Sequence, residues 1–176
     1  MDKAYIFDNS TGNLLYTLDN PSTADITNDD NFGSIVAITE SYSIVGTNGQ
    51  VDPFTNSGVA YIYDNSTGNL LHTLDNPNAY GTVVDDGFGY TVAITESYAI
   101  VGSQKEEDNT YSYSGIAYIF STSTGNLLYT LDNPNDYGTV TNDYFGYNVS
   151  ITESFAIVSG HGEDSTGVTS TGRAYI

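Results

Sequence analysis

The chain repeats one unit of sequence three times. The motif Ala-Tyr-Ile begins at Ala4, Ala60, Ala117 and Ala174, at intervals of 56, 57 and 57 residues. A fixed period of this length is typical of repeat proteins, in which each unit buries its apolar surface against its neighbours. We therefore expect one repeat domain spanning residues 1–176. Its units run approximately over residues 4–59, 60–116 and 117–173, with a trailing strand at 174–176.

Each unit contains four short segments that are typical of β-strands. In the second copy they are Tyr90–Ile94, Tyr98–Val101, Ile116–Phe120 and Asn126–Leu131. The first three are apolar at nearly every position, which indicates strands covered on both faces. The fourth mixes polar and apolar residues and fits an outer position. The sequence thus predicts an all-β fold of four-stranded antiparallel sheets that stack on one another.

The connections between these segments alternate between short and long. Strands one and two are joined by Thr-Glu-Ser, and strands three and four by a turn that ends in Gly12, Gly68 or Gly125. The other two connections are long and variable, and Asn-Pro ends each fourth strand that leads into one. Antiparallel strands place the two kinds of connection on opposite rims of the sheet. We refer to them as the tight-turn rim and the long-loop rim.

The long-loop rim is strongly acidic. It carries 16 of the 22 acidic residues of a chain that has three basic residues and a net charge of −19. A chain without a basic patch repels nucleic acid and anionic membrane surfaces, and we exclude nucleic acid as a partner. We expect a protein or glycan partner on this rim. No apolar run reaches the roughly 20 residues that span a bilayer.

The motifs resemble a known repeat family. Phe-Gly at 88–89, Ile-Val-Gly at 100–102 and Ala-Tyr-Ile-Phe at 117–120 are similar to the FG-GAP repeat of integrin alpha-chain β-propellers. The motifs resemble the bacterial and archaeal versions, which lack the long calcium loop, more than the integrin repeat itself. It implies four-stranded blades around an axis and an extracellular recognition role. The family's calcium sites cannot be carried over, because Thr-Glu-Ser is too short to wrap an ion that needs six to eight oxygens.

The number of repeats leaves the assembly open. Propellers close with typically four to eight blades, so three repeats predict a partial propeller or one completed by oligomerisation. Blade completion between chains would give a closed ring of two chains or a fibre. Blades of a longer polypeptide are a further alternative, and a β-trefoil is another, since it also has three four-stranded repeats.

Residues with metal-binding or catalytic chemistry are few. Acidic side chains precede each Phe-Gly, and their oxygens are weak calcium candidates or caps of the loop. They are Asp29, Asp30, Asp85, Asp86 and Asp143. The repeated Glu40, Glu96 and Glu153 are expected to bond local backbone N–H groups. His161, near Glu163 and Asp164, is a weak metal candidate, and His72 is expected to be a tolerated surface substitution. We expect no cofactor and no enzymatic activity.

Tyrosines gather in the long loops. They are Tyr80, Tyr111, Tyr113, Tyr137 and Tyr144. Aromatic residues among Asn and Asp are typical of sugar-binding and protein-binding surfaces, and they also pack between blades. The sequence therefore predicts an extracellular or cell-surface recognition or adhesion module, although residues 1–176 contain no signal peptide. The alternative is a structural subunit that assembles through its open blade edges.

Overall fold

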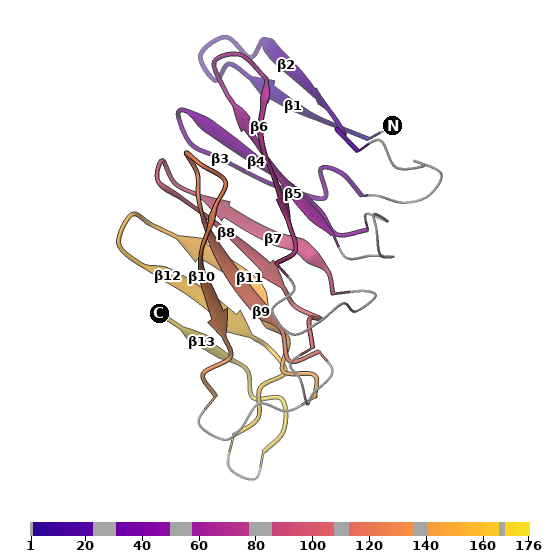
Figure 1. Ribbon diagram of the computed structural model, residues 1–176, viewed down its shortest axis with the longest axis vertical. Helices are drawn as coiled ribbons and strands as arrows, with labels where there is room; N and C mark the ends of the chain where they lie inside the picture. The colour runs from indigo at the N-terminus through magenta and orange to yellow at the C-terminus, as the bar shows by residue number, and fades with distance from the viewer. Residues whose placement is uncertain are drawn as a thin grey trace.

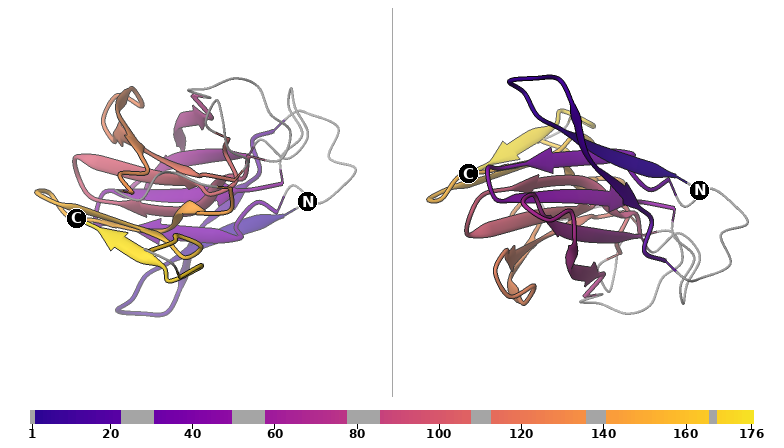
Figure 2. Two further views of the ribbon diagram at one scale, coloured as in Figure 1. Left: turned by 90° about the horizontal axis from the view of Figure 1, so that it is seen from below. Right: turned by 90° about the horizontal axis from the view of Figure 1, so that it is seen from above.

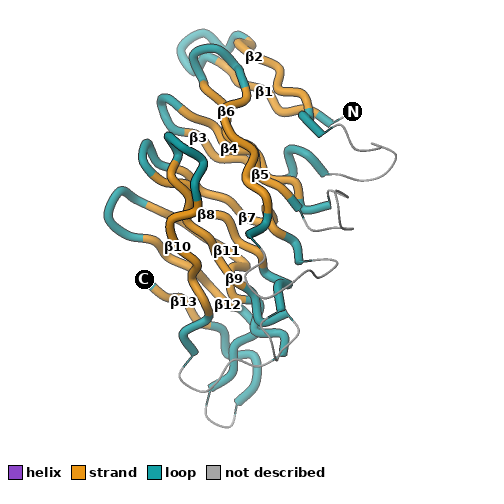
Figure 3. The backbone as a smooth tube through the Cα atoms, viewed as in Figure 1, coloured by secondary structure: helices purple, strands orange, loops and turns teal. Residues whose placement is uncertain are grey.

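The computed structural model of the protein describes residues 2–22, 31–49, 58–77, 86–107, 113–135, 141–165 and 168–176. These residues form thirteen β-strands and no helix (Figure 3). Among them, no helix is long and apolar enough to cross a membrane. The all-β prediction is confirmed.

The strands form four antiparallel sheets. β1 (Lys3–Phe7) pairs with β2 (Leu14–Asp19). The first complete blade contains β3 (Ile35–Ile38), β4 (Tyr42–Thr47), β5 (Val59–Asp64) and β6 (Leu70–Asp75). The second complete blade contains β7 (Phe88–Ile94), β8 (Tyr98–Ser103), β9 (Ile116–Ser121) and β10 (Leu127–Asp132). The last sheet contains β11 (Phe145–Ile151), β12 (Ala156–Gly160) and β13 (Arg173–Tyr175).

Each complete blade is a meander whose strands pair in chain order. Its four strands therefore come from one continuous stretch of about 40 residues, and β6 and β10 lie at the outer edges. The sheets stack face to face from the N-terminus to the C-terminus (Figure 1). The stack does not close on itself. This arrangement is that of propeller blades and differs from the closed β-trefoil alternative.

The core lies between the sheets. The middle strands β5 and β9 are buried at all of their first five positions. The outer strands β6 and β10 are mostly exposed, as their mixed composition predicts. Apolar side chains on both faces of a blade contact a neighbouring blade, which explains why the alternation of polar and apolar residues is missing from the middle strands.

Close approach between the two complete blades depends on glycine. A Cβ atom on Gly46 of β4 would lie 2.3 Å from the backbone oxygen of Gly89, in the next blade. Gly102 repeats the contact one blade later, at 2.1 Å from the oxygen of Gly146. The blades therefore meet backbone to backbone at these points, which no larger residue would allow.

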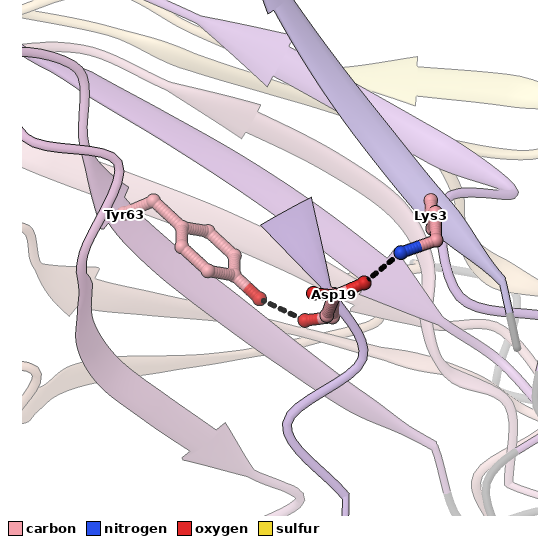
Figure 4. Close-up of polar contacts among 3 residues, drawn as sticks. All are labelled: Lys3, Asp19 and Tyr63. Carbon is pink, nitrogen blue, oxygen red and sulfur yellow. Dashed lines mark hydrogen bonds and ion pairs between the residues drawn. The ribbon is translucent and has the colours of Figure 1, made fainter. Parts of the chain in front are cut away.

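The two kinds of connection lie on opposite rims, as the sequence predicts. The short turns project to the left in Figure 1, and the described ends of the long connections lie on the opposite side. Figure 2 shows the same separation from below and from above. At the N-terminal end, the Tyr63 hydroxyl donates to the Asp19 backbone oxygen at 3.4 Å, and the Lys3 ammonium pairs with the Asp19 carboxylate (Figure 4). The β1–β2 hairpin is thereby tied to the first complete blade.

Candidate recognition surface on the long-loop rim

Two of the five predicted tyrosines lie in the described part of the rim. Tyr113 and Tyr144 stack with ring centroids 5.9 Å apart and an interplanar angle of 10°. Tyr80, Tyr111 and Tyr137 lie outside the described residues, as do Asp29, Asp30 and Asp85. The stacked pair joins the loop before β9 to the loop before β11, so it bridges two blades.

The stack continues through His161, predicted above only as a weak metal candidate, and through Tyr147 and Tyr90, which the sequence did not indicate. His161 stacks on Tyr144 at 5.0 Å and 17°, and it lies 4.2 Å from Tyr147, tilted by 56°. Tyr147 in turn lies 5.5 Å from Tyr90. Tyr113, Tyr144, His161, Tyr147 and Tyr90 thus form a continuous series of five rings, which we call the aromatic ladder. His161 is exposed and the four tyrosines are partly exposed.

The backbone holds one end of the ladder in an unusual conformation. Tyr113 and Tyr144 have φ angles of 59° and 54°, and Asn142 has 73°. Such left-handed conformations are disfavoured for bulky residues and persist where the surroundings enforce them. Here the Tyr144 N–H donates to the Tyr113 carbonyl at 3.0 Å, and the Tyr144 hydroxyl donates to Asn142 Oδ1 at 3.2 Å. The rings are therefore preorganised by the loops.

The other end of the ladder lies on two strands. Tyr90 and Tyr147 follow the Phe-Gly of β7 and β11, at equivalent positions of neighbouring blades. A hydrogen bond between the two side chains raises the pKa of Tyr90, and desolvation adds to the shift. The Tyr90 hydroxyl is therefore neutral at physiological pH. The repeated Phe-Gly-Tyr was a signal that could have identified these residues, but the first repeat has Ser34 there.

Four acidic side chains of the long-loop rim are buried and hydrogen bonded. Asn76 Nδ2 donates to Asp86 Oδ2 at 2.9 Å, and Asn133 Nδ2 makes the same bond to Asp143. In the following loop, the Tyr175 hydroxyl donates to Glu163 Oε2 at 2.5 Å. The equivalent Tyr118 donates to Glu106. Each of these two tyrosine–glutamate hydrogen bonds joins the third strand of a unit to the loop that precedes that strand.

Glu163 has an unusual electrostatic environment. It is fully buried, and burial is the main cause that raises the pKa of its carboxyl group. The charge of Asp143 acts in the same direction, whereas the Tyr175 hydrogen bond and Arg173 oppose it. In the described residues, Glu163 Oε1 makes no hydrogen bond. The described part of the chain brings together no group of three or more metal-ligating side chains.

The glutamates of the tight-turn rim contradict our expectation of local bonds. Glu96 Oε1 accepts from the Ser41 N–H at 3.3 Å, and Glu153 Oε1 accepts from the Ser97 N–H at 3.3 Å. Each carboxylate thus bonds the turn of the preceding blade. The local bonds are made instead by threonine, since Thr39 Oγ1 accepts from the Tyr42 N–H. A Thr-Glu-Ser turn in which the carboxylate serves a neighbour does not fit a calcium loop.

His72 has a packing role that the sequence did not show. A Cβ atom on Gly125 of the next blade would lie 2.8 Å from the His72 ring. Tyr16 makes the equivalent contact with Gly68, at 2.6 Å. The side chain at this position of the outer strand therefore lies against the turn of the following blade.

Comparison with known proteins identifies the repeat. A family model described as FG-GAP repeat matches residues 22–63, 79–120 and 136–176. Each match begins before a first strand and includes the following Ala-Tyr-Ile. A comparison with curated proteins gives no match.

Proposed function

Because the chain belongs to the FG-GAP repeat family, we propose that it is a non-catalytic, extracellular recognition or adhesion module. Its long-loop rim binds a protein or glycan ligand. The aromatic ladder is the observation that carries this proposal. Loops positioned by a rigid scaffold are the usual location of binding residues.

The geometry of the ladder favours a ligand that contacts ring edges and hydroxyls. The ring of Tyr144 is stacked between the rings of Tyr113 and His161, so neighbouring rings lie over its faces. Tyrosine edges and hydroxyls offer both apolar area and hydrogen bonds with little loss of side-chain entropy. The preorganised loops reduce the entropic cost of binding further.

The charge of the chain favours a cationic ligand surface. A net charge of −19 attracts basic groups over a distance set by the salt concentration. Partly exposed Glu107 and Asp164 lie in the loops that carry the ladder. We therefore expect association to slow markedly as the ionic strength rises.

The proposal is tested by binding the chain to arrays of glycans and of extracellular proteins. Tyr144→Ala removes the central stacking contacts and should weaken binding by about tenfold or more, as expected for an aromatic hot spot. Leu15→Ala truncates an exposed side chain of β2, away from the rim, and serves as the matched control. Equal binding by both variants, or no ligand on either array, would contradict the proposal.

A second candidate function is a structural subunit that assembles by blade completion between chains. The observation that favours it is the exposed apolar surface on β3 and on the C-terminal sheet, which includes Val36 and Ile38 on the former and Phe155 and Ile157 on the latter. Exposed apolar patches of this kind mark interaction surfaces or aggregation hazards. Sedimentation of the purified chain over a range of concentrations tests this candidate.

A further inference from the structure

Strand β1 exposes side chains that are buried in the complete blades. Tyr5 and Phe7 are 53% and 55% exposed. Their equivalents in β9, Tyr118 and Phe120, are 0% and 4% exposed and both contact the Phe88 ring. In the part of the chain that the structure describes, β1 has only β2 beside it in its sheet, and no first strand supplies the phenylalanine.

The C-terminal sheet offers the complementary surface. Phe145 of β11 contacts Tyr175 at 5.8 Å, as Phe88 contacts Tyr118. Between the second complete blade and the last sheet lies a hollow of about 190 Å³, lined by Tyr98, Ile119, Tyr129, Ile151, Phe155 and Ala156. The equivalent residues one blade earlier, Tyr42, Ile62 and Ile94, belong to the core cluster that contains Phe120. The hollow therefore corresponds to the site of Phe120, and by position to that of Phe7.

The turn of the β1–β2 hairpin shows the same complementarity. Gly68 and Gly125 lie under the rings of Tyr16 and His72, which come from the preceding blade. Gly12, the equivalent residue, has nothing within 4 Å of the position of a Cβ atom. Tyr129, the next residue in the series, is 62% exposed. The open position beside Gly12 in the first sheet and the uncovered ring of Tyr129 in the second complete blade are thus complementary.

Backbone hydrogen bonds on the tight-turn rim show the same complementarity between the two ends of the stack. The Asn65 N–H donates to the Ser41 carbonyl at 2.9 Å, and the Thr122 N–H donates to the Ser97 carbonyl at 3.1 Å. The equivalent donor and acceptor are Asn9, which is exposed, and Ser154, which borders the hollow.

We infer that the β1–β2 hairpin of a second copy of this chain completes the sheet formed by β11 and β12. This inference rests on the second candidate function. Phe7 of the second copy fills the hollow, Gly12 receives the ring of Tyr129, and β1 displaces β13 from the edge of β12. β13 pairs there through only three residues, Arg173, Ala174 and Tyr175. β1 carries the same Ala-Tyr-Ile sequence in a five-residue strand.

One residue makes the contact between copies weaker than the contact between blades. Ser159 stands where the complete blades have Gly46 and Gly102, whose missing Cβ atoms admit the backbone of the next blade. The serine side chain keeps the first complete blade of the second copy at a greater distance. The expected association is therefore reversible, and it depends on concentration.

Two substitutions test the inference in the full 176-residue chain. Phe7→Ala removes the side chain that fills the hollow. Gly12→Asn keeps the left-handed backbone, which asparagine tolerates, but occupies the space for Tyr129. Sedimentation should show the wild type at twice 18.9 kDa as a closed ring, or larger as a fibre. Each substitution should raise the dissociation constant by about tenfold or more.

Controls separate assembly from folding. Both positions are exposed in the single chain, so thermal unfolding of dilute samples should change little. Leu71→Ala, at an exposed position of β6, should assemble as the wild type does. Ser159→Gly should strengthen the association, because it restores the close approach that Gly46 and Gly102 allow.

The outcomes distinguish this inference from the function on which it rests. A wild-type chain that stays at 18.9 kDa at all concentrations overturns both. A chain that assembles equally well with Phe7→Ala and Gly12→Asn overturns the hairpin contact and leaves assembly by another surface. Loss of assembly in both variants, with Leu71→Ala unaffected, supports the inference.

Discussion

Equivalent strands in different units contain nearly the same sequence but have different surroundings. Val92 and Ile94 of β7 are buried, whereas their equivalents in β3, Val36 and Ile38, are exposed. Ile100 of β8 is buried, and its equivalent Ile157 in β12 is exposed. The difference shows that burial in this fold is set by the neighbouring blade and not by the strand itself. Stability is then a property of each interface between blades.

The largest expected effect comes from the paired isoleucines. Ile100→Ala should destabilise the chain by about 4 kcal/mol, because it removes buried methyl groups and leaves a cavity. Ile157→Ala should cost about 1 kcal/mol, since the side chain is already partly in water. Urea unfolding of the two variants measures the difference. Equal losses of unfolding free energy in the two variants would show that β12 of the last sheet is as well covered as β8 of the second complete blade.

A smaller effect is expected at the glycines between blades. Gly102→Ser introduces the residue that the end sheet has at Ser159, and it forces a side chain against the Gly146 backbone. We expect a loss of about 3 kcal/mol, at the upper end of the usual cost of overpacking. In a dilute single chain, Ser159→Gly should cost about 1 kcal/mol or less, from backbone entropy alone. Urea midpoints of the four single variants place both pairs on one scale.

The smallest effect compares the two rims by their response to pH. Burial raises the pKa of Glu163, so its contribution to stability is full in acid and is lost as the pH rises above the ordinary glutamate value. The pKa values of Glu96 and Glu153 are lowered, chiefly by the hydroxyls of Thr39 and Ser97. Their contribution has the opposite sign, and it is lost as the pH falls.

Glu163→Gln separates the two responses. The variant cannot ionise, so its stability relative to the wild type should increase as the pH rises from mildly acidic to neutral. Glu96→Gln should instead flatten the loss of stability in acid. Thermal unfolding between pH 4 and 7 measures both trends. A wild type and Glu163→Gln variant with parallel pH profiles would contradict the assignment.

Much of the fold could be predicted from the sequence because the period and the apolar runs are local signals. The strands of the second copy were predicted within about two residues, with Phe88–Ile94 observed for Tyr90–Ile94. The positive φ angles of Gly12, Gly68 and Gly125 were also predicted, and they measure 71°, 70° and 70°. The two rims followed from the antiparallel order alone.

Contacts between blades could not be predicted in the same way. Tyr90, Tyr147 and His161 join the ladder only because β7 lies beside β11, a pairing of faces that no local pattern encodes. The error at Glu96 has the same origin. The sequence of one turn shows only its own backbone N–H groups as partners for the glutamate. The Ser41 N–H, which Glu96 actually accepts from, belongs to the adjacent blade, so it can be recognised only once the stacking of the blades is known.

The glutamate of each tight turn has a consequence for how such a chain can lengthen. Every unit brings a carboxylate for the unit before it and a serine amide for the unit after it. A duplicated gene segment would therefore encode both halves of a new junction at once, without any compensating substitution. Duplication of whole units is thus the simplest way to lengthen a chain of this architecture. A duplication that begins within a unit would separate a carboxylate from the serine N–H that it accepts from.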